Sequence, residues 1–178
     1  TKAARAIQEF VIDNLSNWHI RLSRRRFWKG EYSKDKISAY QTLYTVLETV
    51  AILGSPIAPF FMDRLYKDLN AATGKNAAKS VHLALFPTVD ETLIKADLEE
   101  QTHLAQMATS MILSLRKLSD MKVRQPLQKV IIPVLNDSMK QKLESITELL
   151  KQEVNVKEIQ LLTNEEASNL LVKSIKPN

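Results

Sequence analysis

The sequence predicts a mainly α-helical protein, in which an antiparallel helical bundle over residues 1–120 precedes a small βαβα unit over residues 128–178. Apolar residues recur at steps of three and four through the first 120 residues, which is the period of helices with one buried face. After residue 120 this period gives way to two short β-branched runs, which are typical of strands. The chain has only three glycines, which argues against a β-sandwich and against phosphate sites built on a glycine-rich turn.

The first predicted helix runs from near the N-terminus to about Phe27. Its apolar stripe comprises Ile7, Phe10, Val11, Leu15, Trp18 and Leu22. Because this stripe is already under way where the chain starts and no cap precedes it, we expect the sequence to be part of a longer protein. The charged segment 29–35, which contains Gly30, ends the helix.

Three further helices are predicted in the bundle. The second runs from about Ile37 to Gly54, and Ser55 with Pro56 resembles the N-cap and first turn of the third. The buried face of the third helix is expected to hold Phe60, Phe61, Leu65, Tyr66 and Leu69. Residues 70–80 are a predicted loop and residues 80–87 an extended piece. Asp90 is the expected cap of the fourth helix, whose stripe comprises Ile94, Leu98, Ala105, Ala108, Ile112, Leu115 and Leu118.

The C-terminal unit is predicted to contain strands at 129–135 and 156–162 with a helix at 138–152 between them. Two strands that pair through an intervening helix are parallel. The run from Thr163 to Glu166 matches a capping box that opens a last helix.

The net charge of +5 is concentrated in two short segments. Residues 17–36 hold seven basic and two acidic side chains, and residues 116–129 hold five basic and one acidic. The rest of the chain is therefore net acidic. Two concentrated basic patches indicate a polyanionic partner such as RNA.

In the first basic segment, basic residues interleave with Trp18, Phe27 and Trp28, and one helix face is shared by Arg21, Arg24, Arg25 and Trp28. Arginine forks bind phosphate and indole rings stack on bases. We expect Trp18 and Phe27 to be packed inside and Arg24–Arg26 to point outward. Two other interpretations are a solvated face over core tryptophans and arginines paired with the acids of a neighbouring domain.

The second basic segment covers residues 115–127 and includes the junction between the bundle and the appendage at 121–127. Lys122 suits a phosphate, and Arg124 and Gln125 have donors that can bind base edges. Arg116 and Lys117 are further candidates just before the junction. A charged linker explains this segment equally well from the residues alone.

No catalytic, cofactor or metal site is predicted in this chain. There is no cysteine, and His19, His82 and His103 are isolated from one another at no metal-ligand spacing. No P-loop, dinucleotide fingerprint or nucleophile elbow is present. No apolar run is long enough for a membrane span, and the N-terminus has no signal core.

Four blocks of this sequence are similar to the C-terminal part of isoleucyl-tRNA synthetases, in the bacterial group that resembles the eukaryotic cytosolic form. These blocks are NWHIRLSRRRFW, GSPIAPFFMDRLYKDL, SVHLALFP and MKVRQPL, in the family's order, and they cover residues 10–127. Residues 128–178 are similar to the small α/β subdomain that follows. Valyl and leucyl enzymes share the helical bundle, but the SRRRFW block favours the isoleucyl enzyme.

The resemblance implies an anticodon-binding bundle whose parent enzyme attaches isoleucine to its tRNA with ATP and magnesium, and edits mischarged valine elsewhere. The family's HIGH and KMSKS signatures are absent here, so the fragment is expected to bind tRNA without charging it. Lys122, Arg124 and Gln125 are the expected tRNA contacts, and Arg116 and Lys117 come next. Further tRNA-binding candidates, which could instead dock on the catalytic domain, are Arg21, Arg24, Arg25, Arg26 and Trp28. The expected partners are tRNA-Ile and the parent's catalytic domain, with no DNA or membrane, for a cytoplasmic monomer. A helical protein-interaction scaffold with basic patches is the alternative from another functional class.

Overall fold

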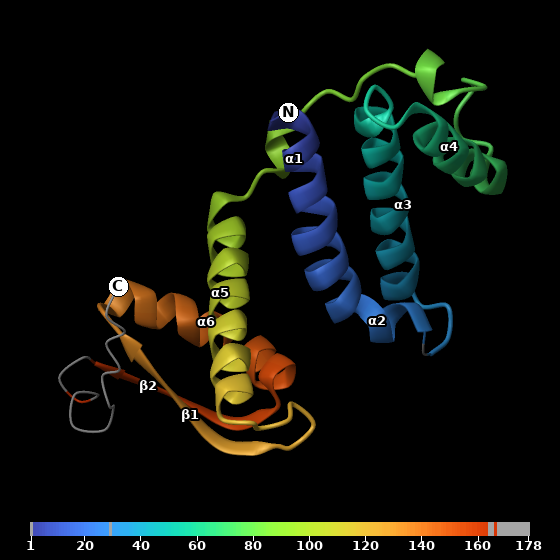
Figure 1. Ribbon diagram of the computed structural model, residues 1–178. Coiled ribbons are helices and arrows are strands. Elements are labelled where there is room, and N and C mark those ends of the chain that lie inside the picture. Colours follow the sequence, from blue (N-terminus) through green and yellow to red (C-terminus); the bar gives the residue numbers. More distant parts are fainter. Residues whose placement is uncertain (1, 29, 164–165, 167–178) are drawn as a thin grey trace. The chain divides into compact units, whose positions relative to one another are not determined.

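The computed structural model describes residues 2–28, 30–163 and 166, and these residues form two compact units (Figure 1). The first unit covers residues 1–90 and the second covers residues 91–178. No helix among the described residues is both long and apolar enough to cross a membrane. The predicted fold class is confirmed, because helices make up most of the chain and one small parallel sheet follows them.

The predicted first helix is confirmed as three consecutive segments, α1 (Lys2–Glu9), η1 (Phe10–Ile20) and α2 (Arg21–Trp28). The middle segment has the wider turns of a π-helix, which the apolar spacing does not distinguish from an α-helix. Leu15, Trp18 and Phe27 are buried along this segment. The expectation that Trp18 and Phe27 are packed is therefore confirmed.

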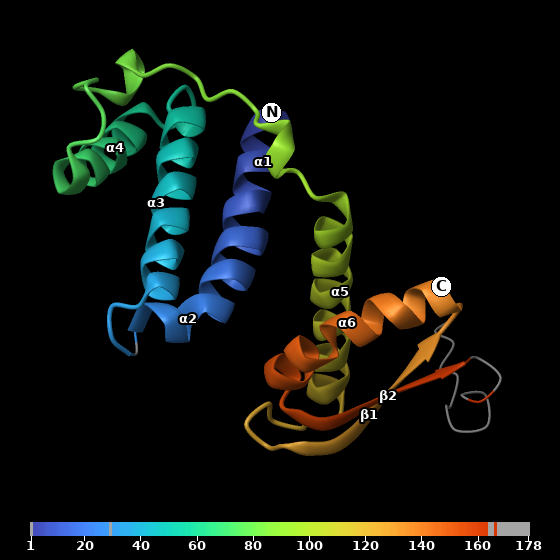
Figure 2. The ribbon, with the colours of Figure 1, turned by 180° about the vertical axis from the view of Figure 1, so that it is seen from behind.

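The second helix, α3 (Lys34–Gly54), runs back antiparallel to the first (Figures 1 and 2). Ser33 is its N-cap, and the Ser33 hydroxyl accepts a hydrogen bond from the Lys36 N–H at 3.2 Å. The Tyr40 hydroxyl donates to the Phe27 carbonyl at 3.0 Å, and the rings of Phe27 and Tyr40 lie 5.3 Å apart. These contacts join the end of α2 to the first turns of α3.

The third helix, α4 (Pro59–Thr73), begins three residues after the predicted start at Pro56. The Ser55 side chain does not cap it, because its hydroxyl donates to the Ile52 carbonyl at 2.9 Å and closes the end of α3. Gly54 lies against α4 and does not form a left-handed turn: a Cβ there would lie 2.7 Å from the Met62 Cε, so the end of this flexible side chain would have to shift.

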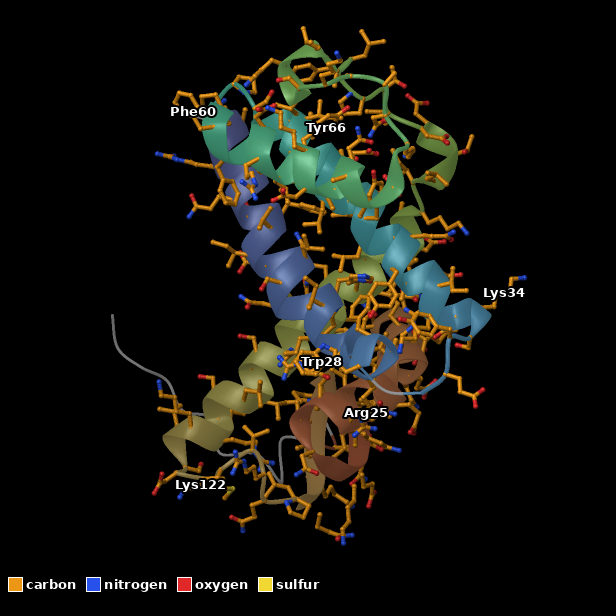
Figure 3. All side chains as sticks on the ribbon, turned by 90° about the vertical axis from the view of Figure 1, so that its right-hand side faces the viewer. Arg25, Trp28, Lys34, Phe60, Tyr66 and Lys122 are labelled. Atoms are coloured by element: carbon orange, nitrogen blue, oxygen red, sulfur yellow. The ribbon has the colours of Figure 1, made fainter. Side chains whose placement is uncertain are left out.

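The buried face of α4 differs in part from the predicted one. Tyr66 is buried in a cluster with Ala51 and Val81, whereas Phe60 and Phe61 are 91% and 67% exposed. Figure 3 shows Tyr66 between α4 and α3 and Phe60 at the outer edge. Only one face of α4 meets α3, and Met62 and Leu65 occupy it with Tyr66, so the two phenylalanines are left outside.

Two carboxylates hold the irregular segment that follows α4. Glu48 accepts hydrogen bonds from the Tyr44 hydroxyl at 3.2 Å, from the Lys75 ammonium at 3.0 Å and from the Asn76 amide. Asp63 accepts from the Ser80 hydroxyl at 2.7 Å and from the Val81 N–H at 3.0 Å. The segment 80–87 is therefore not simply extended, since it opens with the short helical turn η2 (Val81–Leu83) that Asp63 holds.

The second unit contains η3 (Glu91–Leu93), α5 (Ala96–Leu118), β1 (Leu127–Val134), α6 (Asp137–Val154) and β2 (Val156–Thr163). The two strands are parallel, and their register runs from Leu127 opposite Val156 to Val134 opposite Thr163. The predicted strand–helix–strand unit is thus confirmed. Its core lies between the sheet, α5 and α6 and consists of Ile112, Leu113, Val130, Ile132, Leu143, Ile146, Leu150, Val154, Val156 and Ile159.

Two expectations about α5 are wrong, namely its cap at Asp90 and part of its buried face. Lys95, and not Asp90, is the N-cap residue. Ala105 and Ile112 of the predicted stripe are buried, but Ile94, Leu98, Leu115 and Leu118 are exposed. Thr109 and Arg116 are buried instead. The reason is that α5 packs against α6, which covers this face of the helix. By their contacts the compact units meet at 90/91, and the domain division at 120 stays a prediction.

At the end of β2, Thr163 and Glu166 make the reciprocal hydrogen bonds of a capping box. The Thr163 N–H donates to the Glu166 carboxylate at 3.0 Å, and the Glu166 N–H donates to the Thr163 hydroxyl at 3.4 Å. The helix predicted after this box lies outside the described residues.

Replacing Glu48 by Gln is expected to lower the free energy of unfolding by about 1–2 kcal/mol, because the Lys75 ammonium would lose its charged acceptor in a half-enclosed place. Burial alone would raise the pKa of Glu48, but hydrogen bonds from Asn76 and Lys75 bring that pKa below its ordinary value. Urea denaturation of the purified protein measures the change. Glu9→Gln, at an exposed glutamate of α1, is the control and should leave the urea midpoint in place.

The Asp63 carboxylate is expected to make the first unit sensitive to acid. Hydrogen bonds from Lys67, Ser80 and the Val81 N–H lower the pKa of Asp63 from 3.8 to about 2. A depressed pKa stabilises the fold fully above the unfolded value, so this contribution is lost as the pH falls from about 4 to about 2. Melting curves should show that Asp63→Asn is less stable than the parent at pH 6 and that this gap closes towards pH 2. The prediction is wrong if the difference in stability between Asp63→Asn and the parent is the same at every pH. It is also wrong if Asp13→Asn, at an exposed aspartate, lowers the stability equally.

Candidate nucleic-acid interface

The last turn of α5 contains a buried arginine whose guanidinium bonds to the backbone of two other segments. Arg116 is only 3% exposed. One terminal nitrogen donates to the Val154 carbonyl at 3.2 Å, at the end of α6. The other donates to the carbonyls of Lys122 and Gln125. Arg116 thus joins the end of α5 to the segment after it and to the end of α6.

Asn155, in the turn between α6 and β2, bonds to the same segment from the other side. Its side-chain amide donates to the Val123 carbonyl at 2.9 Å and to the Arg124 carbonyl at 3.2 Å. Its backbone is left-handed, with φ at 52°, a conformation that asparagine tolerates better than most residues. The Asn155 carbonyl also accepts from the Leu127 N–H at 3.1 Å, where β1 begins.

These two side chains fix the junction loop, which we define as residues 119–126. The carbonyls of four consecutive residues, 122 to 125, accept hydrogen bonds from Arg116 and Asn155. A turn bond from the Gln125 N–H to the Lys122 carbonyl, 3.0 Å long, closes the loop on itself. The loop therefore has a defined main-chain path although it contains no helix or strand.

The side chains of the junction loop are exposed. Lys122, Arg124 and Gln125 all face solvent, and Lys117 is exposed one turn earlier on α5. Figure 3 shows Lys122 at the edge of its unit. No ion pair of Lys117, Lys122 or Arg124 occurs among the described residues. Four of the five predicted residues of this segment are thus exposed, with their donors available to a ligand.

The fifth residue, Arg116, was expected to be available for tRNA binding, and the structure contradicts this expectation. Its guanidinium is enclosed and bonded to three carbonyls, so it does not lie on the surface where a phosphate could reach it. The helix period around residues 112–116 places its side chain on the same face as Ile112, towards α6. The sequence shows a cation at position 116, but it does not show which face of α5 packs against α6.

The first basic segment divides into residues that hold the fold and residues that face solvent. Arg26 forms two hydrogen bonds with the Asp35 carboxylate, at 2.6 and 2.8 Å, and thereby ties α2 to the start of α3. This pair lowers the pKa of Asp35 below its ordinary value. The Arg21 guanidinium lies 5.8 Å from the centre of the Trp18 ring. Arg26 does point outward, with its side chain 39% exposed, but its guanidinium is paired with Asp35.

Arg24, Arg25 and Trp28 form the exposed part of this segment, which we name the α2 end. The two arginines are exposed and Trp28 is 83% exposed. Figure 3 shows Arg25 and Trp28 together at this end of the helix. An exposed indole beside two guanidinium groups can stack on a base or pack against another protein surface.

The described residues contain no group of three or more histidine, aspartate or glutamate side chains that could hold a metal ion. What they present are cations, amides and an aromatic ring, which suit the binding of a polyanion. Asn155 is the residue that sequence reasoning missed. Its place after a helix and before a strand favours a left-handed helix end, but its bonds to a loop about 30 residues away leave no sequence signal.

Comparison with known proteins places these surfaces in a family. The sequence model described as the anticodon-binding domain of tRNA ligase matches residues 1–132, which include both basic segments. The isoleucine–tRNA ligase of Cytophaga hutchinsonii is 54% identical over all 178 residues, and that of Bacteroides thetaiotaomicron is 52% identical over 99% of the chain. The isoleucine–tRNA ligase of Clostridium tetani is 39% identical over the whole chain.

The chain spans only 15–16% of the length of these relatives. Within that share the likeness is continuous, since it extends from the first helix through the parallel strands. The matched range contains the junction loop and the α2 end. The chain belongs to the family of anticodon-binding domains of tRNA ligases.

Proposed function

We propose that this chain is the tRNA-binding part of an isoleucine–tRNA ligase and that the junction loop is its principal contact with the anticodon stem and loop. The observation that carries the proposal is the exposed set of Lys122, Arg124 and Gln125 on a loop whose backbone is fixed from behind. The similarity to isoleucine–tRNA ligases over the whole chain supports the choice of tRNA.

The three side chains suit different parts of an RNA loop. The Lys122 ammonium is a point charge for a phosphate, and the Arg124 fork can make paired hydrogen bonds to a phosphate or a base edge. The Gln125 amide carries both donor and acceptor groups, which a base edge also presents. Unpaired anticodon bases are open to such contacts, whereas side chains cannot read the deep, narrow major groove of an RNA duplex.

For the full-length protein we propose attachment of isoleucine to tRNA-Ile, with ATP and magnesium bound outside this chain. The residues that the structure describes supply exposed binding groups, so the contribution that we propose for them is to position the tRNA. We further propose that the protein works as a cytoplasmic monomer and that this chain also contacts the catalytic domain. Size-exclusion chromatography of the full-length protein checks the oligomeric state.

Substituting Lys122, Arg124 and Gln125 together by Ala in the full-length ligase is expected to raise the KM for tRNA-Ile at least roughly tenfold, because charge-assisted hydrogen bonds to RNA are lost. Isoleucine-dependent exchange of pyrophosphate into ATP should not change, since adenylate formation does not need the tRNA. The slope of the logarithm of tRNA affinity against the logarithm of salt concentration should also become shallower by about two, because two cations that can neutralise phosphates are removed.

The matched control for this triple variant lies on α1, where Lys2, Arg5 and Gln8 have the same three side-chain types and are also exposed. Their substitution by Ala removes the same charge and should leave the KM and the salt slope as in the parent. Equal effects of the two triple variants would mean that only net charge matters, and the junction loop would lose its role.

At the α2 end, we propose contact with the tRNA backbone. The double variant Arg24→Ala, Arg25→Ala is expected to raise the KM for tRNA-Ile by roughly three- to tenfold and to leave the pyrophosphate exchange unchanged. Glu9→Ala with Asp13→Ala, on the same helical segment, is a control of opposite charge. If pyrophosphate exchange or thermal stability falls instead while the KM stays constant, the α2 end contacts the catalytic domain and not RNA.

A further inference from the structure

The junction loop lacks the usual source of structural order. Met121 and Val123, its apolar residues, are 42% and 45% exposed, so no side chain of the loop is anchored in the core. Loops of this kind sample many backbone conformations unless hydrogen bonds restrict them. Here the restriction comes from the side chains of Arg116 and Asn155, which we name the clasp.

The clasp satisfies the carbonyls of Lys122, Val123, Arg124 and Gln125 from the inside of the unit. The main chain of the loop cannot rotate without breaking at least one of these bonds. The outward side chains therefore start from fixed positions. Binding by a fixed loop loses less conformational entropy than binding by a mobile one, so affinity is higher for the same contacts.

The clasp also extends across the boundary of the family match. The matched range ends at residue 132, but Asn155 and the Val154 carbonyl lie beyond it, at the α6–β2 turn. The apolar core of the unit, with Leu143 and Leu150, carries α6 and sets where that turn lies. The α/β part of the second unit, which consists of β1, α6 and β2, thus holds the loop in place through hydrogen bonds from outside the loop.

We infer that Arg116 and Asn155 are positioning residues for RNA binding, which fix the junction loop without touching the RNA, and that the α/β unit is for this reason a working part of the tRNA interface. This inference rests on the proposed function of the loop. It assigns to Asn155 and to the α6–β2 turn a role in recognition, acting through Lys122, Arg124 and Gln125.

Asn155 permits a selective test because a substitution can remove the hydrogen bonds of its side chain and keep its left-handed backbone conformation. Asn155→Gly keeps the left-handed backbone, which glycine adopts readily, and removes only the two amide hydrogen bonds to the loop. Asn155→Asp keeps the shape of the side chain but turns a carboxylate oxygen towards two carbonyls. The Gly variant loses the clasp bonds, and the Asp variant replaces them by repulsion.

In the full-length ligase with a tRNA-Ile transcript, Asn155→Gly is expected to raise the KM by roughly three- to tenfold and Asn155→Asp by more, with kcat unchanged at saturating tRNA. Pyrophosphate exchange and the melting temperature of Asn155→Gly should equal those of the parent. Arg116→Lys, which keeps the charge but not the fork that reaches three carbonyls, should raise the KM in the same way. Amide hydrogen exchange should become faster in residues 121–126.

A double-mutant cycle separates positioning from a general structural effect. In the background where Lys122, Arg124 and Gln125 are already Ala, Asn155→Gly should raise the KM no further, because the residues through which it acts are gone. An equal rise in both backgrounds, or a parent-like KM for both Asn155 variants, overturns the inference. If the Ala triple variant itself leaves the KM unchanged, the proposed function of the loop fails first, and the two failures are thus distinguishable.

Discussion

The buried guanidinium of Arg116 is the constraint on which the second unit depends. A charged group enclosed at 3% exposure is tolerated only where hydrogen-bond acceptors replace water, and three backbone carbonyls do so here. These carbonyls come from the end of α6 and from the junction loop, so Arg116 brings both to the last turn of α5. The path of the chain from α5 into β1 follows from this requirement.

In the first unit, carboxylates hold an irregular segment in place, as the guanidinium of Arg116 does in the second unit. Glu48 and Asp63 are carboxylates on α3 and α4, and each accepts several hydrogen bonds from the segment after α4. In both units, apolar helix faces provide the burial, while a charged side chain from a helix fixes the irregular chain beside it. Buried polar groups of an irregular segment need hydrogen-bond partners, so polar side chains with several bonds help to determine its shape, beside the buried Val81 in the first unit.

The basic residues of this chain therefore have two distinct uses. Arg26 pairs with Asp35 and Arg116 binds carbonyls, and both hold elements of the fold together. Arg24, Arg25, Lys122 and Arg124 are exposed, so that phosphate groups can approach them. The net charge of the chain is the sum over both groups of residues, so by itself it does not show how many cations are exposed. Each of these two cations lies within a few residues of exposed ones, and Arg116 fixes the backbone of the loop that carries Lys122 and Arg124.

The sequence by itself determined the helices, the two parallel strands, the packed positions of Trp18 and Phe27 and the places of both basic segments. These features follow from local periods, caps and charge, which are visible within a window of about 20 residues. Only the tertiary structure decided that α4 starts at Pro59, that Phe60 faces solvent, that α5 packs on α6 and that Arg116 points inward. Each of these depends on which face of a helix another element covers. The bonds of Asn155 to the junction loop join residues about 30 positions apart, and such contacts arise from the folded arrangement and leave no trace in local spacing.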